Sequence, residues 1–127
     1  MPIRSVLGML AKQISAQKHE QREATLYRNL MRHEARIGGT VFGAVPKDRR
    51  REFFCLDEHT WVWHEEWTDK NGQHQVVTTR YDVRPSGIVK SQNGSHYQSV
   101  NADEAKRLFK AAQLYKQKIN QEIYNFA

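Results

Sequence analysis

Four polar side chains suited to acid–base chemistry fall close together in the middle of the sequence. His64 and Glu66 stand two residues apart, and Thr78 and Arg80 repeat that spacing downstream. On paired neighbouring strands, such residues project from adjacent positions on one face, where an imidazole and a carboxylate can move protons. Because the sequence supplies no pocket or lid for that face, we favour a polar surface patch over an active site and assign no catalytic residue.

A second group of candidate residues lies on the opposite face. Glu65 falls between two tryptophans, one of which is Trp67, and a carboxylate among apolar rings is costly unless it is paired or lies at the rim. Two interpretations follow. Glu65 pairs with an arginine of the N-terminal helix, such as Arg28 or Arg32, or it marks the entrance of a ligand cavity together with Trp67 and Tyr81.

A metal centre is not expected from the histidines and carboxylates. His59, His64, Glu66 and His74 are near one another in sequence, but a hairpin places His74 at its turn end, away from His59, so three ligands do not converge. The sequence also lacks a phosphate-binding glycine loop, a CxxC pair, a nucleophile elbow and an HExxH motif. We therefore expect neither a metal nor another cofactor.

Residues 52–99 are predicted to form the sheet that carries these side chains. All three tryptophans fall here, and apolar runs are interrupted at short intervals by turn residues, as in an antiparallel meander. Five strands are expected, at 52–56, 60–68, 73–84, 88–91 and 95–99.

Three glycines at the ends of four-residue turn groups predict the pairing of these strands. The groups 69–72, 84–87 and 91–94 each suit a three-residue loop whose last residue is left-handed. A two-residue turn at Asn71 and Gly72 would instead set charged residues among the tryptophans, so we reject it. The pairs that follow are Trp61 with Tyr81, Trp63 with Thr79, Arg84 with Ile88, Val89 with Tyr97 and, across the first connection, Phe54 with Trp63.

Helices are predicted before and after the sheet in the sequence. Residues 1–37 read as one long helix, or as two with a hinge near residues 15–18, and residues 38–51 as a basic loop. Residues 101–125 read as a closing helix with Asn101 as N-cap and Glu104 reaching back to its backbone N–H. The whole predicts a single α+β domain, 1–127, with the helices packed on the aromatic face of a five-stranded antiparallel sheet.

The positive charge is concentrated at the N-terminal end. Of the net charge of +6, residues 1–51 hold eleven Lys or Arg and four Asp or Glu, a net of +7. Such asymmetry favours contact with nucleic acid or an acidic protein, although a solvated helix face and a solubilising loop have the same composition. The candidate polyanion-binding residues are Arg28, Arg32 and Arg36 on the helix and Lys47, Arg49, Arg50 and Arg51 in the loop.

Residues 1–14 form an amphipathic stretch with an apolar stripe interrupted by Gly8. Such a helix folds back on its own domain, pairs with a second copy as a homodimer, or lies on a membrane surface. No run is long enough to cross a bilayer and no signal peptide is recognised, so we expect a cytoplasmic protein. The single cysteine, Cys55, is expected to be a small buried hydrophobe in a strand.

The segment RREFFCLDEHTWVWHEEWTDKNG followed by VVTTRYDVRPSGIVKSQNG resembles a group of small basic bacterial proteins without an assigned activity. The resemblance covers most of residues 33–118 and implies a bacterial intracellular setting, with no catalytic residues to carry over. From the residues themselves we expect a non-enzymatic binding module whose basic N-terminal segment contacts a polyanion. The alternatives are a ligand-binding protein or enzyme with a cavity between helices and sheet, and a membrane-surface or dimerisation protein acting through residues 1–14.

Overall fold

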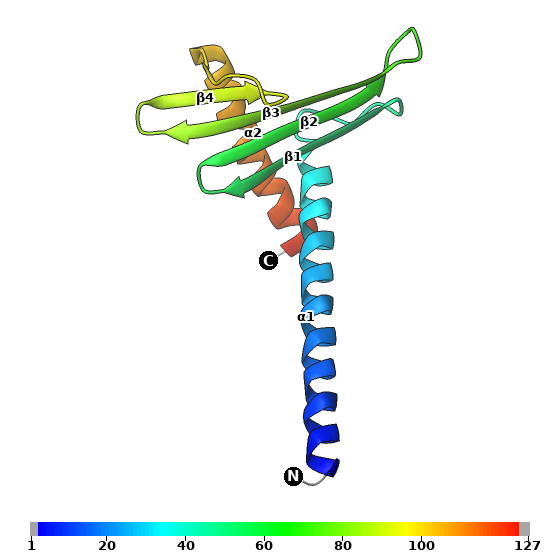
Figure 1. Ribbon diagram of the computed structural model, residues 1–127. Coiled ribbons are helices and arrows are strands. Elements are labelled where there is room, and N and C mark those ends of the chain that lie inside the picture. Colours follow the sequence, from blue (N-terminus) through cyan, green and yellow to red (C-terminus); the bar gives the residue numbers. More distant parts are fainter. Residues whose placement is uncertain (1–2, 125–127) are drawn as a thin grey trace. The chain divides into compact units, whose positions relative to one another are not determined.

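The computed structural model describes residues 3–124, and side chains from residue 8 onward. It confirms the predicted α+β fold: an N-terminal helix, a five-stranded antiparallel sheet and a C-terminal helix (Figure 1). The chain forms two compact units, residues 1–33 and 34–127. The elements are α1 (Ile3–Gly38), β1 (Arg49–Asp57), β2 (Thr60–Thr68), β3 (His74–Arg84), β4 (Gly87–Gln92), β5 (Gln98–Ser99), α2 (Ala102–Ile119) and a π-helix, η1 (Asn120–Tyr124).

The first unit is helical throughout its described length. α1 continues without a break through residues 15–18, so the alternative with a hinge there is wrong. Its side chains from Gly8 to Asn29 are exposed, and they include Leu26 and Tyr27 at 68% and 63% exposure.

The end of α1 belongs to the second unit and packs closely on β1. Ala35 and Ile37 are buried, and the two glycines that follow lie against the strand backbone. A Cβ atom on Gly38 would lie 1.8 Å from the carbonyl oxygen of Phe53, and one on Gly39 would lie 2.1 Å from that of Arg51. Only residues without a side chain allow this approach of helix end to strand.

The pairing of β2 with β3 is the one predicted from the first glycine turn. Trp61 lies opposite Tyr81, and Asp69 closes the turn by donating its N–H to the Gln73 carbonyl. The Asp69 carboxylate accepts hydrogen bonds from the backbone N–H of Gln73, the side-chain amide of Gln75 and the backbone N–H of Asn71, and these bonds hold its pKa below the usual value. The turn is thus fixed by its first residue as well as by its glycine.

The pairing of β1 with β2 differs from the prediction by one residue over most of its length. Leu56 has no pairing partner, and this bulge places Phe53, rather than Phe54, opposite Trp63. Because neighbouring strand residues face opposite sides, the shift turns Phe53 and Cys55 inward. The turn residues near position 57 give no sequence signal for the unpaired residue, Leu56.

β4 is also shifted by one residue. Arg84 pairs with Gly87 and not with Ile88. Gly87 has a φ of +136°, far from the value of about +57° that the left-handed residue of a three-residue loop adopts. The shift places Lys90 opposite Tyr81, on the aromatic face.

The third turn is a two-residue turn, where a three-residue loop was predicted. Asn93 and Gly94 both have positive φ, 49° and 76°, as a type I′ turn requires. Val89 pairs with Ser99, two positions from the predicted Tyr97, so that predicted pairing is wrong, and the change of turn accounts for one of the two positions.

The core of the second unit lies between the aromatic face of the sheet and α2. Phe53 is fully buried, stacks on Trp61 with ring centroids 5.2 Å apart and meets the edge of Tyr115 at 5.9 Å. α2 crosses that face, with Glu104 contacting β4 and Tyr115 contacting β1 (Figure 1). The buried cluster comprises Ile37, Val41, Phe53, Trp61, Leu108, Ala111, Tyr115 and Ile119.

We predict that Gly38→Ala lowers the free energy of unfolding by roughly 1–3 kcal/mol, because the added methyl group must displace the β1 backbone. Urea titration followed by tryptophan fluorescence measures the change. Gly8→Ala is the matched control, because a Cβ there meets nothing within 4 Å, and its midpoint should not fall. An unchanged midpoint for Gly38→Ala would contradict the close contact.

Candidate functional site

A groove of about 600 Å³ opens between the aromatic face of the sheet and α2. Apolar contact comes from the sheet, from α2 and from the loop before β1, and the aromatic residues that line the groove are Phe42, Phe53, Trp63, Trp67 and Tyr81. Its charged lining residues are Arg49, Glu65, Lys90, Glu104 and Arg107. The three residues proposed from the sequence to mark a cavity, Glu65, Trp67 and Tyr81, all line it.

One end of the groove is organised around Glu65. Its carboxylate accepts a hydrogen bond of 2.7 Å from the indole N–H of Trp63 and one of 3.2 Å from Arg49. Arg51 lies 3.5 Å from the same carboxylate, and the Arg49 guanidinium stands 5.0 Å from the centre of the Trp67 ring. The partners of Glu65 are therefore strand arginines, and the predicted pairing with Arg28 or Arg32 is replaced by these contacts.

The other end is organised around Glu104, in the first turn of α2. Lys90 donates to both of its carboxylate oxygens at 2.8 and 2.9 Å, and the Tyr81 hydroxyl donates at 2.9 Å. Burial raises the pKa of Glu104, but the hydrogen bonds from Lys90 and Tyr81 outweigh it and leave the pKa below its usual value. Burial and the same carboxylate strongly raise the pKa of Tyr81, so this hydroxyl remains a donor at neutral pH.

Sequence reasoning missed the role of Glu104. Asn101 caps α2 as predicted, accepting a hydrogen bond of 2.8 Å from the Glu104 backbone N–H. The Glu104 side chain, however, turns to the sheet rather than back to Asn101. The signal that could have found it is the β4 register, since only the observed shift sets Lys90 beside Tyr81.

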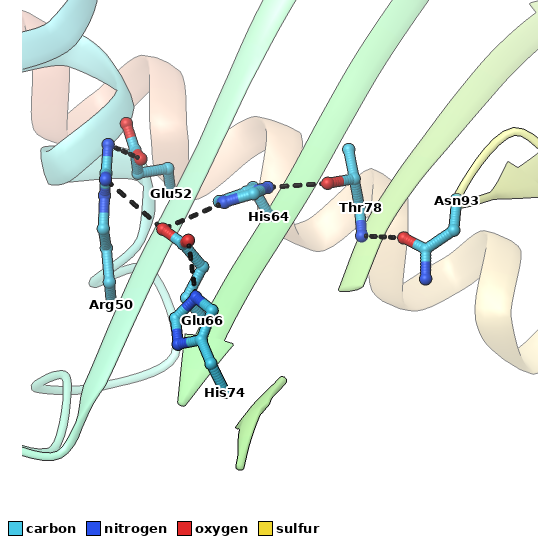
Figure 2. Close-up of polar contacts among 7 residues, drawn as sticks. All are labelled: Arg50, Glu52, His64, Glu66, His74, Thr78 and Asn93. Atoms are coloured by element: carbon cyan, nitrogen blue, oxygen red, sulfur yellow. Dashed lines mark hydrogen bonds and ion pairs between the residues drawn. The ribbon is translucent and has the colours of Figure 1, made fainter. Parts of the chain in front are cut away.

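A polar network covers part of the opposite face of the sheet (Figure 2). The Nδ1 atom of His64 lies 2.6 Å from the hydroxyl oxygen of Thr78, and its Nε2 atom lies 3.3 Å from a Glu66 oxygen. His74 contacts the other Glu66 oxygen at 3.2 Å. We call these residues, with those that join them in Figure 2, the outer network: Arg50, Glu52, His64, Glu66, His74, Thr78 and Asn93.

The outer network has the order of a proton relay. With Nε2 protonated, His64 donates to Glu66 and accepts from the Thr78 hydroxyl, which is the arrangement of a hydroxyl, a base and an orienting carboxylate. Arg80, the fourth residue of the predicted patch, does not join it, because its guanidinium pairs with Asp82 at 3.2 Å. The residues of the groove lie on the other face, so the outer network does not contact a molecule bound there.

The charged end of the basic loop predicted at residues 38–51 is largely strand, because β1 begins at Arg49. Arg49, Arg50 and Arg51 begin β1 and alternate between its two faces. Arg50 lies 2.7 Å from Glu52 and 3.3 Å from Glu66, while the other two meet Glu65. Three of the predicted polyanion-binding residues are thus paired with carboxylates inside the sheet, and Lys47 is exposed just before it.

The predicted basic row on α1 is present as a row of exposed side chains. Arg28 and Arg32, in the first unit, are four residues apart in α1 and share a helix face, Arg36 belongs to the second unit, and all three side chains are exposed. Among the residues that the structure describes, none of the three has a hydrogen bond or an ion pair. This row therefore keeps more unpaired positive charge than the arginines of β1.

Comparison with family models, with curated proteins and with solved structures found no match for this chain. Within residues 3–124, no helix combines the length and apolar character needed to cross a membrane. The described side chains also include no group of three or more His, Cys, Asp or Glu residues arranged to hold a metal ion. Function has to be inferred from the geometry of the groove, the outer network and the α1 row.

We predict that Glu66 makes stability depend on pH. Hydrogen bonds from His64, and then from His74, hold its pKa below the usual value in the folded protein. A lowered folded-state pKa adds stability above the unfolded-state value of about 4.3, and this stability is lost as pH falls through the folded-state pKa. Glu66→Gln should therefore be less stable than the parent near neutral pH, and the gap should narrow from about pH 4.3 downward and close as pH falls through the lowered folded-state pKa.

Urea midpoints measured from neutral to acidic pH test this expectation. Glu58→Gln, in the exposed β1–β2 turn, is the control for the loss of one negative charge. A gap between Glu66→Gln and the parent that stays constant across the range would contradict the assigned role of Glu66.

Proposed function

We propose that this protein binds a small, largely apolar ligand in the groove between the sheet and α2. The observation that carries the proposal is the combination of size and lining. Ligand pockets commonly measure about 300–1,000 Å³ and are lined by apolar and aromatic side chains with a few placed polar groups. The groove has a volume of about 600 Å³, five aromatic residues and two hydrogen-bonded carboxylates.

The polar groups of the groove favour binding over catalysis. Glu65 is held by Trp63 and Arg49, and Glu104 is held by Lys90 and Tyr81. A carboxylate with its oxygens already occupied and its pKa lowered, as for Glu104, is a poor general base at neutral pH. The hydrogen bonds of Glu65 and Glu104 hold the groove in a fixed shape with a fixed charge pattern, against which a ligand can pack.

Two variants on adjacent residues of β3 test the groove. Val77 lines it, whereas Val76 is exposed on the opposite face. Nile red, a neutral planar dye whose emission brightens in apolar surroundings, should bind the parent protein and Val76→Trp equally. Val77→Trp should weaken dye binding by tenfold or more, because the indole fills the groove.

Trp67→Ala provides a second measurement in case Val77→Trp fails to fold. Loss of one aromatic surface should reduce the affinity for the dye by roughly threefold to tenfold. Circular dichroism must show the parent helix content for each variant. No binding by the parent, or equal binding by all three variants, would overturn the proposal.

We also propose that the α1 row contacts nucleic acid through its phosphates. Support comes from its three exposed arginines, which have no ion pair among the described residues. Neutralising three phosphates gives a dependence of log affinity on log salt of roughly −2.7 for duplex DNA. Sequence-independent, salt-sensitive binding is therefore the expected behaviour.

Charge reversal of the row tests this second function. Replacing Arg28, Arg32 and Arg36 together by Glu should abolish the gel shift of a short random-sequence DNA duplex. The matched control reverses Lys12, Lys18 and Arg22, which carry the same charge on the same helix outside the row, and should lose less affinity. Equal losses in both triple variants, or binding of polyglutamic acid but not of DNA, would overturn the assignment.

The role predicted for residues 1–14, attachment to a membrane surface or to a second copy, stays a prediction. Met9, Leu10 and Ile14 are exposed apolar side chains in this stretch. The side chains of residues 1–7, which complete the predicted stripe, lie outside the described residues.

A further inference from the structure

The hydrogen-bonding capacity of the groove is unevenly used. The two oxygens of Glu65 accept from Trp63 and from Arg49, and the two oxygens of Glu104 accept from Lys90 and Tyr81. A ligand entering the groove therefore meets carboxylates that already accept hydrogen bonds from protein donors and whose charge is paired with a protein cation. Donors carried by a ligand would share these oxygens with the protein groups.

Unused hydrogen-bond donors, in contrast, remain in the groove. Arg107 lines the groove, is exposed, and has no hydrogen bond or ion pair within the described part of the chain. It is near enough to Glu104 for its positive charge to contribute to the lowered pKa of that carboxylate, although the hydrogen bonds from Lys90 and Tyr81 contribute more. A guanidinium carries five N–H donors, and its fork geometry matches a carboxylate.

The charges that line the groove are also unbalanced. Arg49 pairs with Glu65 at one end, and Lys90 and Arg107 stand beside the single carboxylate of Glu104 at the other. The lining thus holds three cations and two anions, with the extra cation at the Glu104 end. An anionic group is attracted to that end, whereas a cationic group is repelled.

The aromatic surfaces do not favour a cation either. Aromatic cages bind ammonium and guanidinium groups through exposed ring faces. Here the guanidinium of Arg49 already stands over Trp67 at 5.0 Å, and that of Arg51 stands over Trp63 at 5.7 Å. The protein's own arginines occupy the positions that a cationic ligand would need.

We infer that the ligand of the groove is an amphipathic anion, with a planar apolar body against the apolar and aromatic lining and a carboxylate bound by Arg107. The inference rests on the proposed ligand-binding function and adds the chemical class of the ligand. The carboxylate accepts hydrogen bonds from the unpaired guanidinium, while the apolar body displaces water from the groove. Arg107 is thereby a specificity-determining residue.

Naphthoate and its neutral amide, naphthamide, test the inference, because they share size and shape and differ in charge. Titration calorimetry should show naphthoate binding the parent protein roughly tenfold more tightly than naphthamide, the effect of one charge-assisted hydrogen-bonded pair. Arg107→Ala should reduce naphthoate affinity to that of naphthamide and leave naphthamide unchanged. Lys106→Ala, the adjacent exposed cation on α2 that does not line the groove, should keep the tenfold preference.

The outcomes separate this inference from the function on which it rests. Equal binding of the two probes, lost in Val77→Trp, would keep the groove as the site and overturn its preference for anions. A preference that survives in Arg107→Ala would overturn the role of that residue. Absence of binding by naphthoate, naphthamide and Nile red alike would overturn the inference together with the proposed function.

Discussion

The arrangement of this protein depends on one unpaired residue in its first strand. Leu56 has no partner across β2, and the residues before it are displaced by one position relative to a regular hairpin. The displacement sends Phe53 into the core, where it contacts Trp61 and Tyr115. The same displacement decides which arginines of β1 face the tryptophans and which face the outer network. Core, groove and surface are thus set by the same local irregularity.

The two glycines at the end of α1 fix the strand in that position. Gly38 and Gly39 lie against the carbonyl groups of Phe53 and Arg51, and the residue just before them, Ile37, enters the core. A side chain at either glycine would push β1 away from the helix end. The position of β1 also determines its ion pairs, because it brings Arg49 and Arg51 next to Glu65. A segment that looks in sequence like a basic loop is in the structure a strand whose charges are shared with its neighbour.

The sequence was sufficient for the element order and for one hairpin, and the reasons for the remaining errors are physical. The β2–β3 pairing followed from Gly72 because Asp69 and a left-handed glycine define that turn without ambiguity. Gly87 and Gly94 gave the same signal, but Gly87 has another conformation and Gly94 follows a second residue with positive φ, Asn93, because turn geometry depends on strand packing as well as on local residue type. The groove residues Glu65, Trp67 and Tyr81 could be named from alternation alone. Lys90 and Glu104 could not, since their contact requires the shifted register of β4 and the packing of α2.

Both edges of the sheet are unsuitable for adding a further strand. An exposed strand edge pairs readily with another chain, and natural proteins suppress this with charges, cover or short strands. On β1 the carbonyls of Arg51 and Phe53 are covered by the glycines of the helix end, and three consecutive arginines begin the strand. At the opposite border β5 is only two residues long. These two borders therefore offer little backbone for pairing with another strand.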